Sequence, residues 1–256
     1  MEALFFGPSS SSLLGVYHPA SAHQDRYQGV VLCYPFGQEY MRAHRAFRQL
    51  AVALAKKGFH VLRFDYPGTG DSAGNIEEVT ARQWSEGIEI AVQELKDMAG
   101  VQSVTLVGLR LGALLAADVA ARRNDITGLV LWDPIITGGG YVDALKVTSA
   151  HVPSRRRQSN FIDADGNLHF NGFAMSIAFQ ASLADLNLVE LRPACGRILQ
   201  VSSHESDGFS ALRQMWQCME GYEYRHVPAA HDWNYVDHVG GILLPQPILQ
   251  EIIHWM

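Results

Sequence analysis

Residues 104–113 read VTLVGLRLGA, and this stretch decides the fold. Val104–Val107 is a short apolar run that contains β-branched residues, the composition of a buried strand. Two glycines, Gly108 and Gly112, then flank a sharp turn and leave it room to pack against its neighbours. The chain continues as an apolar segment with no helix breaker. The stretch therefore predicts a strand, a tight turn and a helix in immediate succession, with Arg110 at the middle of the turn.

On both sides of this stretch, apolar runs of strand length alternate with segments of helical period. That alternation is typical of an α/β fold with a mostly parallel central sheet and helices on both faces. Strands are predicted at residues 3–6, 13–17, 30–34, 60–64, 103–107, 128–132, 197–201 and 222–227. Helices with one apolar face are predicted at 43–57 and around 84–95. Residues 7–12 are too few for a crossover helix, so the first two strands should form an antiparallel hairpin at the sheet edge.

One long segment, residues 137–193, interrupts this alternation. It contains the glycine triplet Gly138–Gly140, the basic cluster Arg155–Arg157, a predicted hairpin that turns at Asp165-Gly166 and a predicted helix at 173–186. A connection between core elements does not need this length, so we interpret the segment as a cap over the open end of the sheet. The whole chain, 1–256, is then a single domain with an inserted cap.

The composition excludes several classes of protein. The chain has 256 residues, of which 48% are hydrophobic and 18% charged, and a net charge of −6. These values favour a globular protein over a disordered one and give no sign of a nucleic-acid partner. No apolar run reaches the length of a membrane span. The first residues, 1–12, lack the basic start and long apolar stretch of a signal peptide, so we expect a cytoplasmic protein.

The sequence contains no recognisable motif for a metal or a cofactor. Three widely spaced cysteines form neither a disulfide framework nor a zinc motif. His226, His231, Asp232, Asp237 and His238 are metal-binding residue types, but their spacing matches no metal motif. The glycine-rich loop at Gly68 and Gly70 lacks the lysine and helix entry of a phosphate-binding loop. We therefore expect neither a metal nor a cofactor.

Four loops follow predicted core strands, at the edge where open α/β sheets bind their ligands. They are Tyr34–Glu39, Asp65–Ser72, Gly108–Ala113 and Ala230–Asp232. In this order they resemble the oxyanion loop, the glycine-rich loop, the nucleophile elbow and the catalytic-histidine loop of the α/β-hydrolase fold, and the resemblance covers nearly the whole chain. The patterns PFGQEY and GLRLGA are also similar to a bacterial subgroup labelled exosortase-associated hydrolase type 2, or serine-aminopeptidase-like.

Arg110 is where the sequence departs from the hydrolase pattern. The elbow motif is G-x-S-x-G, and here arginine occupies the position of the serine nucleophile; no other G-x-S-x-G is present. A guanidinium cannot attack a carbonyl, because it stays protonated and carries only donors. Arg110 could bind a carboxylate or phosphate, or stabilise charge on a carbonyl oxygen. Alternatively, it could pair with Asp207, Glu39 or Asp133 and fill the space of a substrate.

A histidine and an acid remain available for proton chemistry. His231 follows the last core strand, as the catalytic histidine of the resembling family does, and is the candidate general base. Asp207 follows the preceding strand and is the first candidate for the acid that orients it. Asp133, at the end of an earlier strand, is the second candidate. Glu205 is a further rival.

Backbone amides can form an oxyanion site whatever the side chains are. The resemblance implies donors from Leu111, just after the elbow position, and from Phe36 or Gly37 in the first loop. Losing the serine leaves these N–H groups intact. Glu39 belongs to the same loop and is a candidate to face the substrate, although a solvated loop carboxylate is the commoner state.

These residues support three functional hypotheses. In the first, His231 and Asp207 act as a general base while Arg110 and the amides polarise an ester, thioester or other carbonyl substrate. In the second, the protein is an inactive pseudo-hydrolase that binds a ligand or partner. In the third, an unrecognised serine acts as the nucleophile. The substrate or ligand is expected to be a small molecule, with an anionic group or a carrier-bound acyl group as the fitting chemistry for Arg110 and Arg155–Arg157.

Overall fold

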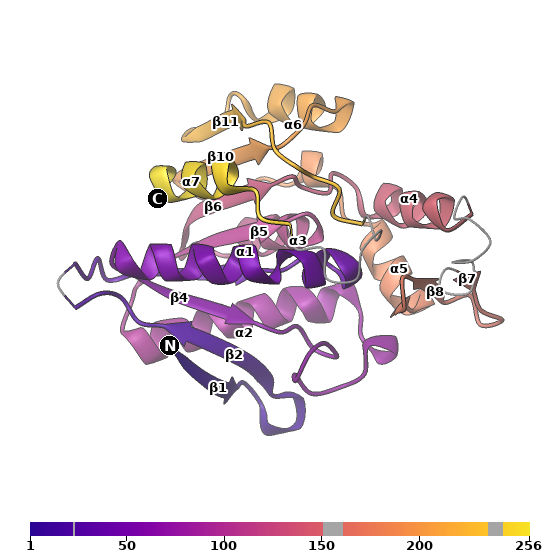
Figure 1. Ribbon diagram of the computed structural model, residues 1–256, viewed down its shortest axis with the longest axis horizontal. Coiled ribbons are helices and arrows are strands. Elements are labelled where there is room, and N and C mark those ends of the chain that lie inside the picture. Colours follow the sequence, from indigo (N-terminus) through magenta and orange to yellow (C-terminus); the bar gives the residue numbers. More distant parts are fainter. Residues whose placement is uncertain (23, 151–160, 235–242) are drawn as a thin grey trace.

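The computed structural model describes residues 1–22, 24–150, 161–234 and 243–256. An eight-stranded sheet in the order β1-β2-β4-β3-β5-β6-β10-β11 forms the centre of the molecule (Figure 1). The strands are β1 (Glu2–Phe6), β2 (Leu13–His18), β3 (Gln28–Cys33), β4 (Phe59–Phe64), β5 (Ser103–Leu109), β6 (Ile126–Trp132), β10 (Arg197–Ser202) and β11 (Tyr222–His226). Within the described residues of this sheet, the pairs β1–β2 and β2–β4 are antiparallel and the others are parallel. The mostly parallel sheet and the N-terminal hairpin are therefore confirmed.

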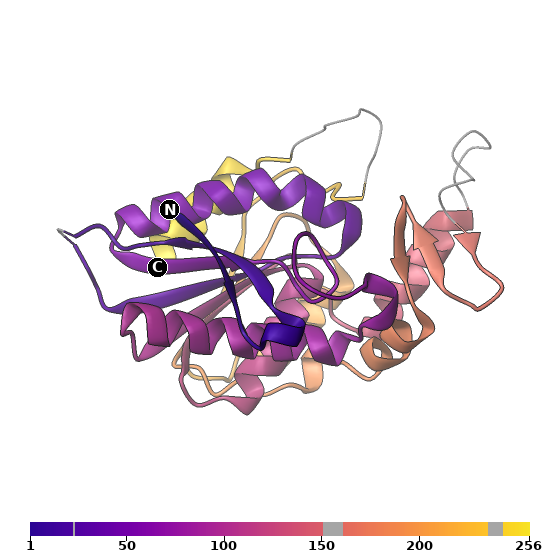
Figure 2. The same cartoon turned by 90° about the horizontal axis from the view of Figure 1, so that it is seen from below.

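Helices cover both faces of this sheet. The helices of the core are α1 (Gly37–Lys56), α2 (Ala81–Ala99), α3 (Leu111–Arg122), α6 (Asp207–Trp216) and α7 (Gln246–Trp255). Helices α1 and α7 lie against one face, and α2 and α3 lie against the other (Figure 2). None of the helices in the described ranges is both long and apolar enough to cross a bilayer.

The two helices predicted from periodicity are present, with different starting points. A capping box between Thr80 and Gln83 starts α2, and Gly100, with a φ of 67°, ends it. Helix α1 begins at Gly37, well before the predicted start at residue 43, so its first turn is part of the loop that follows β3. The prediction missed this turn because GQEY has no apolar periodicity. Because α1 begins at Gly37, Glu39 lies in its first turn, at the positive end of the helix dipole.

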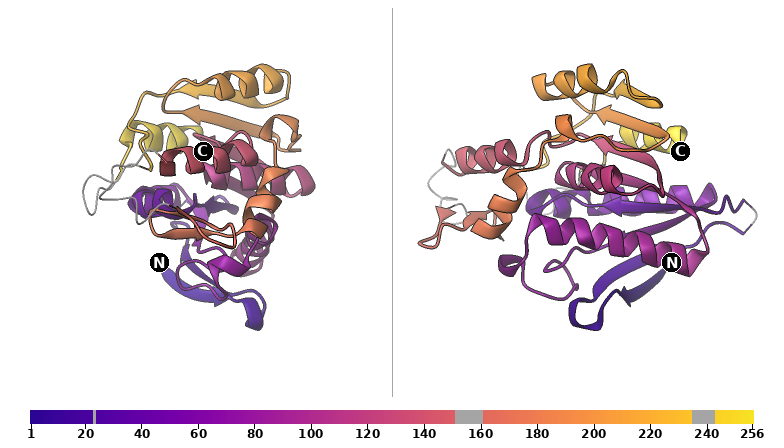
Figure 3. Two further views of the ribbon diagram at one scale, coloured as in Figure 1. Left: turned by 90° about the vertical axis from the view of Figure 1, so that its right-hand side faces the viewer. Right: turned by 180° about the vertical axis from the view of Figure 1, so that it is seen from behind.

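Residues 137–150 and 161–193 form a compact group beyond one end of the core (Figure 1). Their described elements are α4 (Gly138–Ala150), β7 (Phe161–Ile162), β8 (Leu168–Phe170), β9 (Phe173–Met175), α5 (Ile177–Ala184) and the 3-10 turn Leu188–Glu190. The three strands make a separate antiparallel sheet, and α4 and α5 lie beside it on the right of Figure 1, as the view from behind in Figure 3 also shows. The hairpin at Asp165-Gly166 is confirmed.

The predicted helix at 173–186 is wrong in its first turn. Residues Phe173–Met175 pair with β8 through a tight turn at Asn171 and Gly172, both of which have positive φ, so the helix begins only at Ile177. The side chain of Ser176 caps it by accepting a hydrogen bond from the amide of Phe179. The cluster Arg155–Arg157 lies outside the described residues.

Candidate functional site

The turn between β5 and α3 has the geometry expected for the elbow. Arg110 has φ 54° and ψ −117°, and its amide donates to the carbonyl of Trp132 at 3.0 Å. A Cβ on Gly112 would collide with the carbonyl oxygens of Cys33 and Tyr34, and one on Gly108 would collide with the first turn of α3. The two glycines are therefore needed to bring the turn against the end of β3. The positive φ of Arg110 stores strain on the order of 1 kcal/mol or more, which the surroundings must sustain.

Arg110 forms an ion pair with a buried carboxylate. Its Nε donates to Oε1 of Glu39 at 3.2 Å, and the side chain of Glu39 is 0% exposed whereas that of Arg110 is 21% exposed. Tyr141 donates its hydroxyl to Oε2 of Glu39 at 3.3 Å, and Asn234 donates to Oε1 at 2.8 Å. Burial alone would lower the pKa of Arg110, but Glu39 and Tyr141 outweigh it and hold that pKa above its ordinary value.

This network decides which partner Arg110 takes. Of the three acids expected as partners, Glu39 pairs with it, and the guanidinium approaches Asp133 only through the backbone carbonyl, at 3.5 Å. Glu39 is not a solvated loop carboxylate, because α1 begins before it and carries it inward. Arg110, at the middle of the elbow, is thus held in an ion pair within the protein.

Asp133 is the buried acid of the neighbouring cluster. It is 0% exposed, and it accepts hydrogen bonds from the amide and the hydroxyl of Ser203, both at 2.7 Å, and from the indole of Trp233 at 3.4 Å. Like Arg110, it has a positive φ, 42°. Three donors offset the cost of burying this carboxylate.

His204 lies next to Asp133 and was not anticipated from the sequence. Its Nδ1 is 3.1 Å from Oγ of Ser203 and 4.0 Å from Oδ1 of Asp133. Because the single hydroxyl proton of Ser203 goes to Asp133, Nδ1 of His204 must be the donor to Ser203, which leaves Nε2 as the free acceptor. Burial lowers the pKa of His204 below its ordinary value; Asp133 opposes this shift, while His231 and Arg110 add to it.

His231, the candidate base, stacks on His204. The two rings are 4.1 Å apart with an interplanar angle of 19°. His231 is exposed, and its Nδ1 donates to the carbonyl of Ala229 at 3.1 Å. In the described parts of the chain, no hydrogen bond or ion pair joins it to Asp207, which is exposed at the first position of α6. The structure therefore brings the histidine pair to Asp133, the second candidate for the acid.

The other sequence-predicted groups lie around the elbow. Glu205 is exposed, and its Oε1 lies 3.7 Å from Nδ1 of His226. Among the described residues, it makes no hydrogen bond or ion pair with His204 or His231. No hydrogen bond within the described ranges uses the amides of Phe36, Gly37 or Leu111 as donors. These N–H groups thus remain available to an acceptor. No cluster of three or more potential metal ligands occurs among the described residues.

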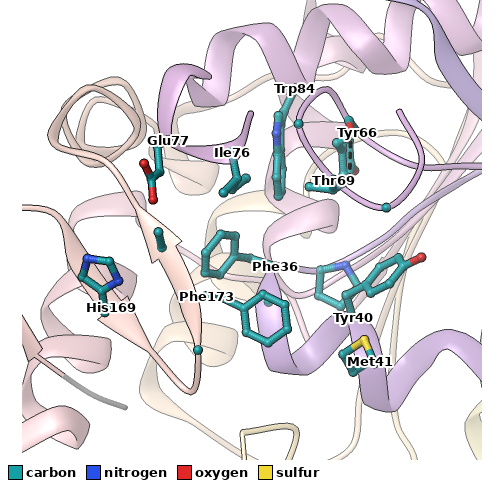
Figure 4. Close-up of a pocket in the computed structure, with 16 residues that line it drawn as sticks. Phe36, Tyr40, Met41, Tyr66, Thr69, Ile76, Glu77, Trp84, His169 and Phe173 are labelled. Carbon is teal, nitrogen blue, oxygen red and sulfur yellow. Dashed lines mark hydrogen bonds between the residues drawn. The ribbon is translucent and has the colours of Figure 1, made fainter. Parts of the chain in front are cut away.

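A cavity of about 400 Å³ opens beside this network, between the loops after β3 and β4 and the small sheet. Its walls are largely aromatic: Phe36, Tyr40, Tyr66, Trp84 and Phe173 line it, with Met41 and Ile76 (Figure 4). Trp84 stacks on Tyr66 at 4.3 Å, and the ring of Phe36 lies 6.4 Å from that of Phe173. We call this space the aromatic cavity.

The aromatic cavity and the Arg110 network meet only at the first loop. Phe36 and Gly37 line the cavity, but Arg110, Leu111, Asp133, His204 and His231 do not. The site that could take a ligand is therefore displaced from the residues expected to carry the chemistry. No sequence motif indicated the cavity, because its walls come from segments that are far apart along the chain.

The sheet order, the elbow and the loops at the carboxyl ends of the strands define an α/β hydrolase. A family model described as serine aminopeptidase, S33 matches residues 40–171, and the chain belongs to this family. None of the curated proteins compared with the chain matches it.

Several solved structures share the fold at low sequence identity. Est1E from Butyrivibrio proteoclasticus, solved with ferulic acid bound, has a TM-score of 0.68 and 16% identity, with 99% of this chain and 96% of that chain covered. Alpha/beta hydrolase domain-containing protein 10 from mouse has a TM-score of 0.60 and 15% identity, with 100% and 96% covered. A Pyrococcus furiosus esterase has a TM-score of 0.65 and 15% identity, with 90% and 82% covered. At this identity the likeness concerns the fold alone.

Proposed function

We propose that this protein is a pseudo-hydrolase, a member of the hydrolase family that binds a small ligand in the aromatic cavity without a covalent acyl intermediate. The observation that carries the proposal is the ion pair between Arg110 and Glu39 at the elbow. Breaking this pair to bind a substrate anion would leave Glu39 buried without its counter-charge, at a cost of several kcal/mol. Arg110 therefore acts as a fixed part of the scaffold.

The walls of the cavity indicate the kind of ligand. Stacked and tilted rings at Trp84, Tyr66, Phe36 and Phe173 offer flat apolar surfaces, which suit an aromatic ring or an acyl chain. Glu77 and His169 add polar groups to the lining, which also includes Phe36 and Gly37, whose amides donate no hydrogen bond among the described residues. A ligand with an apolar body and one carbonyl group fits this distribution.

Neither Ser203 nor Ser72 presents its hydroxyl to a ligand as a replacement nucleophile would. Ser203 is 3% exposed and its hydroxyl donates to Asp133. Ser72 is 8% exposed; its hydroxyl donates to the carbonyl of Asp65 at 2.7 Å and accepts from the amide of Leu14 at 2.9 Å. Both hydroxyls serve the backbone and the buried acid, which supports a binding protein over a conventional serine hydrolase.

We expect Phe173→Ala to weaken ligand binding about tenfold, because it removes roughly 1–1.5 kcal/mol of apolar contact from the cavity wall. Ferulic acid, the molecule bound in the structural neighbour, and decanoic acid are suitable probes, with affinity measured by isothermal titration calorimetry. Phe161→Ala is the matched control, since Phe161 lies on the same small sheet, is 46% exposed and does not line the cavity. Equal affinities in the two variants would contradict binding in this cavity.

A serine-free enzyme is the second candidate, and the chain from Asp133 through Ser203 to His204 supports it. This chain of hydrogen bonds fixes the tautomer of His204 and leaves Nε2 as a base, with His231 stacked beside it. In this form of the hypothesis Asp133 replaces Asp207 as the orienting acid. Water activated at Nε2 would attack an ester or thioester whose carbonyl oxygen accepts from the amide of Leu111.

The two candidates differ in a turnover experiment. If the pseudo-hydrolase proposal holds, p-nitrophenyl esters and acyl thioesters are not turned over and a fluorophosphonate probe does not label the protein. Turnover without labelling that falls about 100-fold or more in His204→Gln would establish the serine-free enzyme instead. Labelling of wild type would show that a serine nucleophile operates. Glu86→Gln, at an exposed helix position, controls for non-specific effects.

Three further properties belong to the same proposal. The motifs PFGQEY and GLRLGA support membership of the exosortase-associated type 2 subgroup. Residues 137–193 act as a cap on a single domain, since β8 and β9 contribute part of the cavity wall. The protein binds a small molecule in the cytoplasm, with an acyl group on a carrier as one form of that ligand.

A further inference from the structure

A second cavity, of about 450 Å³, lies on the other side of Tyr40 from the aromatic cavity. It is enclosed by the β1–β2 hairpin, α1, β4 and the loop after β4. Tyr40 and Gly70 line both cavities, and the hydroxyl of Tyr40 points away from the aromatic one (Figure 4). The lining of the second cavity is rich in titratable side chains: Arg48, Arg63, His44, Asp65 and Asp71.

Arg63 is a buried cation whose hydrogen-bond partners are both neutral. It is 6% exposed, and it donates from Nε to Nε2 of His18 at 3.2 Å and from one terminal nitrogen to the hydroxyl of Tyr34 at 3.0 Å. Burial and the adjacent Arg63 lower the pKa of His18 to about 4, so His18 stays neutral and acts as an acceptor. Within the described ranges, Arg63 makes no ion pair. A buried guanidinium without a counter-charge is unfavourable unless an anion completes its surroundings.

The carboxylates of the cavity are engaged elsewhere. Asp65 accepts from the hydroxyl of Tyr40 at 2.9 Å and from the amide of Asp71 at 3.3 Å, and neither acid reaches ion-pair distance of Arg63. Asp71 is exposed at the rim. The acids therefore line the same cavity as Arg63 without forming an ion pair with it.

Two more basic side chains face the same space from α1. His44 and Arg48 are one helical turn apart, so they lie on one face of the helix, and both line the cavity. Burial and the charge of Arg63 lower the pKa of His44; Asp65 opposes this shift, and Arg48 adds to it. Arg63 within the wall and Arg48 at the rim thus approach one space from a strand and a helix.

We propose that this second cavity binds a compact oxyanion, a phosphate or carboxylate group, with Arg63 as the buried contact and Arg48 as the outer one. The guanidinium of Arg63 keeps N–H groups beyond the two donated to His18 and Tyr34, and planar guanidinium groups match the oxygens of such anions. The anion is either a free ion or the charged end of a ligand whose apolar part enters the aromatic cavity across Tyr40. The site does not depend on the proposed function.

Calorimetric titration of the whole protein with inorganic phosphate tests this proposal. We expect saturable binding to wild type, weakened at least tenfold in Arg63→Gln and about threefold in Arg48→Gln, the latter because an exposed charge contributes less. Arg82→Gln, which removes an exposed arginine from α2, should bind like wild type. If Arg63→Gln does not show cooperative unfolding and is therefore not folded, the phosphate affinity of Arg48→Gln, compared with that of Arg82→Gln, decides the test. Absence of saturable binding to wild type, or equal affinity in all variants, would overturn the proposal.

Phenyl phosphate distinguishes the two sources of the anion. If the site takes the charged end of a longer ligand, phenyl phosphate binds more tightly than inorganic phosphate, and Phe173→Ala removes that advantage while leaving phosphate binding unchanged. If the site takes a free ion, the two probes bind with similar affinity, and Phe173→Ala affects neither. Both outcomes support the oxyanion site, and the test does not require a known ligand of the aromatic cavity.

Discussion

Glu39→Ala should destabilise the protein by about 3–5 kcal/mol, because it leaves the guanidinium of Arg110 without the carboxylate that neutralises it. The substitution also removes the acceptor for Tyr141 and Asn234. The measured quantity is the decrease in the free energy of unfolding, obtained from urea denaturation followed by tryptophan fluorescence. Since single substitutions commonly cost 0.5–3 kcal/mol, an effect of this size points to an unpaired buried charge.

Two further variants isolate the ion pair as the cause. Glu86→Ala removes an exposed glutamate paired with Arg82 and should change stability by no more than about 0.5 kcal/mol. Replacing both partners, as Glu39→Gln with Arg110→Met, should recover much of the loss, since paired apolar or neutral groups carry no buried charge. A cost of less than about 1 kcal/mol for Glu39→Ala would contradict a structural role for the pair.

Gly112→Ala is expected to cost about 3 kcal/mol or more, or to prevent folding, because its new methyl group has no space. The added Cβ would collide with the carbonyl oxygens at the end of β3, which are backbone atoms and cannot move without displacing the strand. Soluble yield and the urea midpoint give the measurement. The elbow would then be fixed by packing whatever the residue at its middle position.

Gly139→Ala is the matched control for this substitution. Gly139 lies in α4, and the nearest atom to its added Cβ is 3.8 Å away, at ordinary contact distance. Alanine has the higher helix propensity, so this variant should be as stable as wild type or more stable by up to about 1 kcal/mol. If Gly112→Ala behaved like Gly139→Ala, the close approach of α3 to β3 would not constrain the turn.

The hydrolase fold could be predicted because its signals are local. The eight core strands, the N-terminal hairpin and the faces of α1 and α2 follow from apolar periodicity and turn residues, which act over a few neighbours. The glycines at 108 and 112 specify the elbow in the same way, since each allows a close backbone approach. Where local signals conflict, as at Phe173–Met175, the pairing of β9 with β8 overrode the helical pattern.

The sequence by itself therefore determined the sheet, the elbow and the arginine at the middle of the elbow. Only the tertiary structure decided what that arginine contacts, because Glu39 lies 71 residues away in the sequence. Glu39 belongs to the first turn of α1, which precedes the part of the helix that shows apolar periodicity. The same holds for Asp133 with His204, for the aromatic cavity and for the surroundings of Arg63 in β4. Charge pairing and burial depend on which distant segments the fold brings together, and no local pattern encodes those contacts.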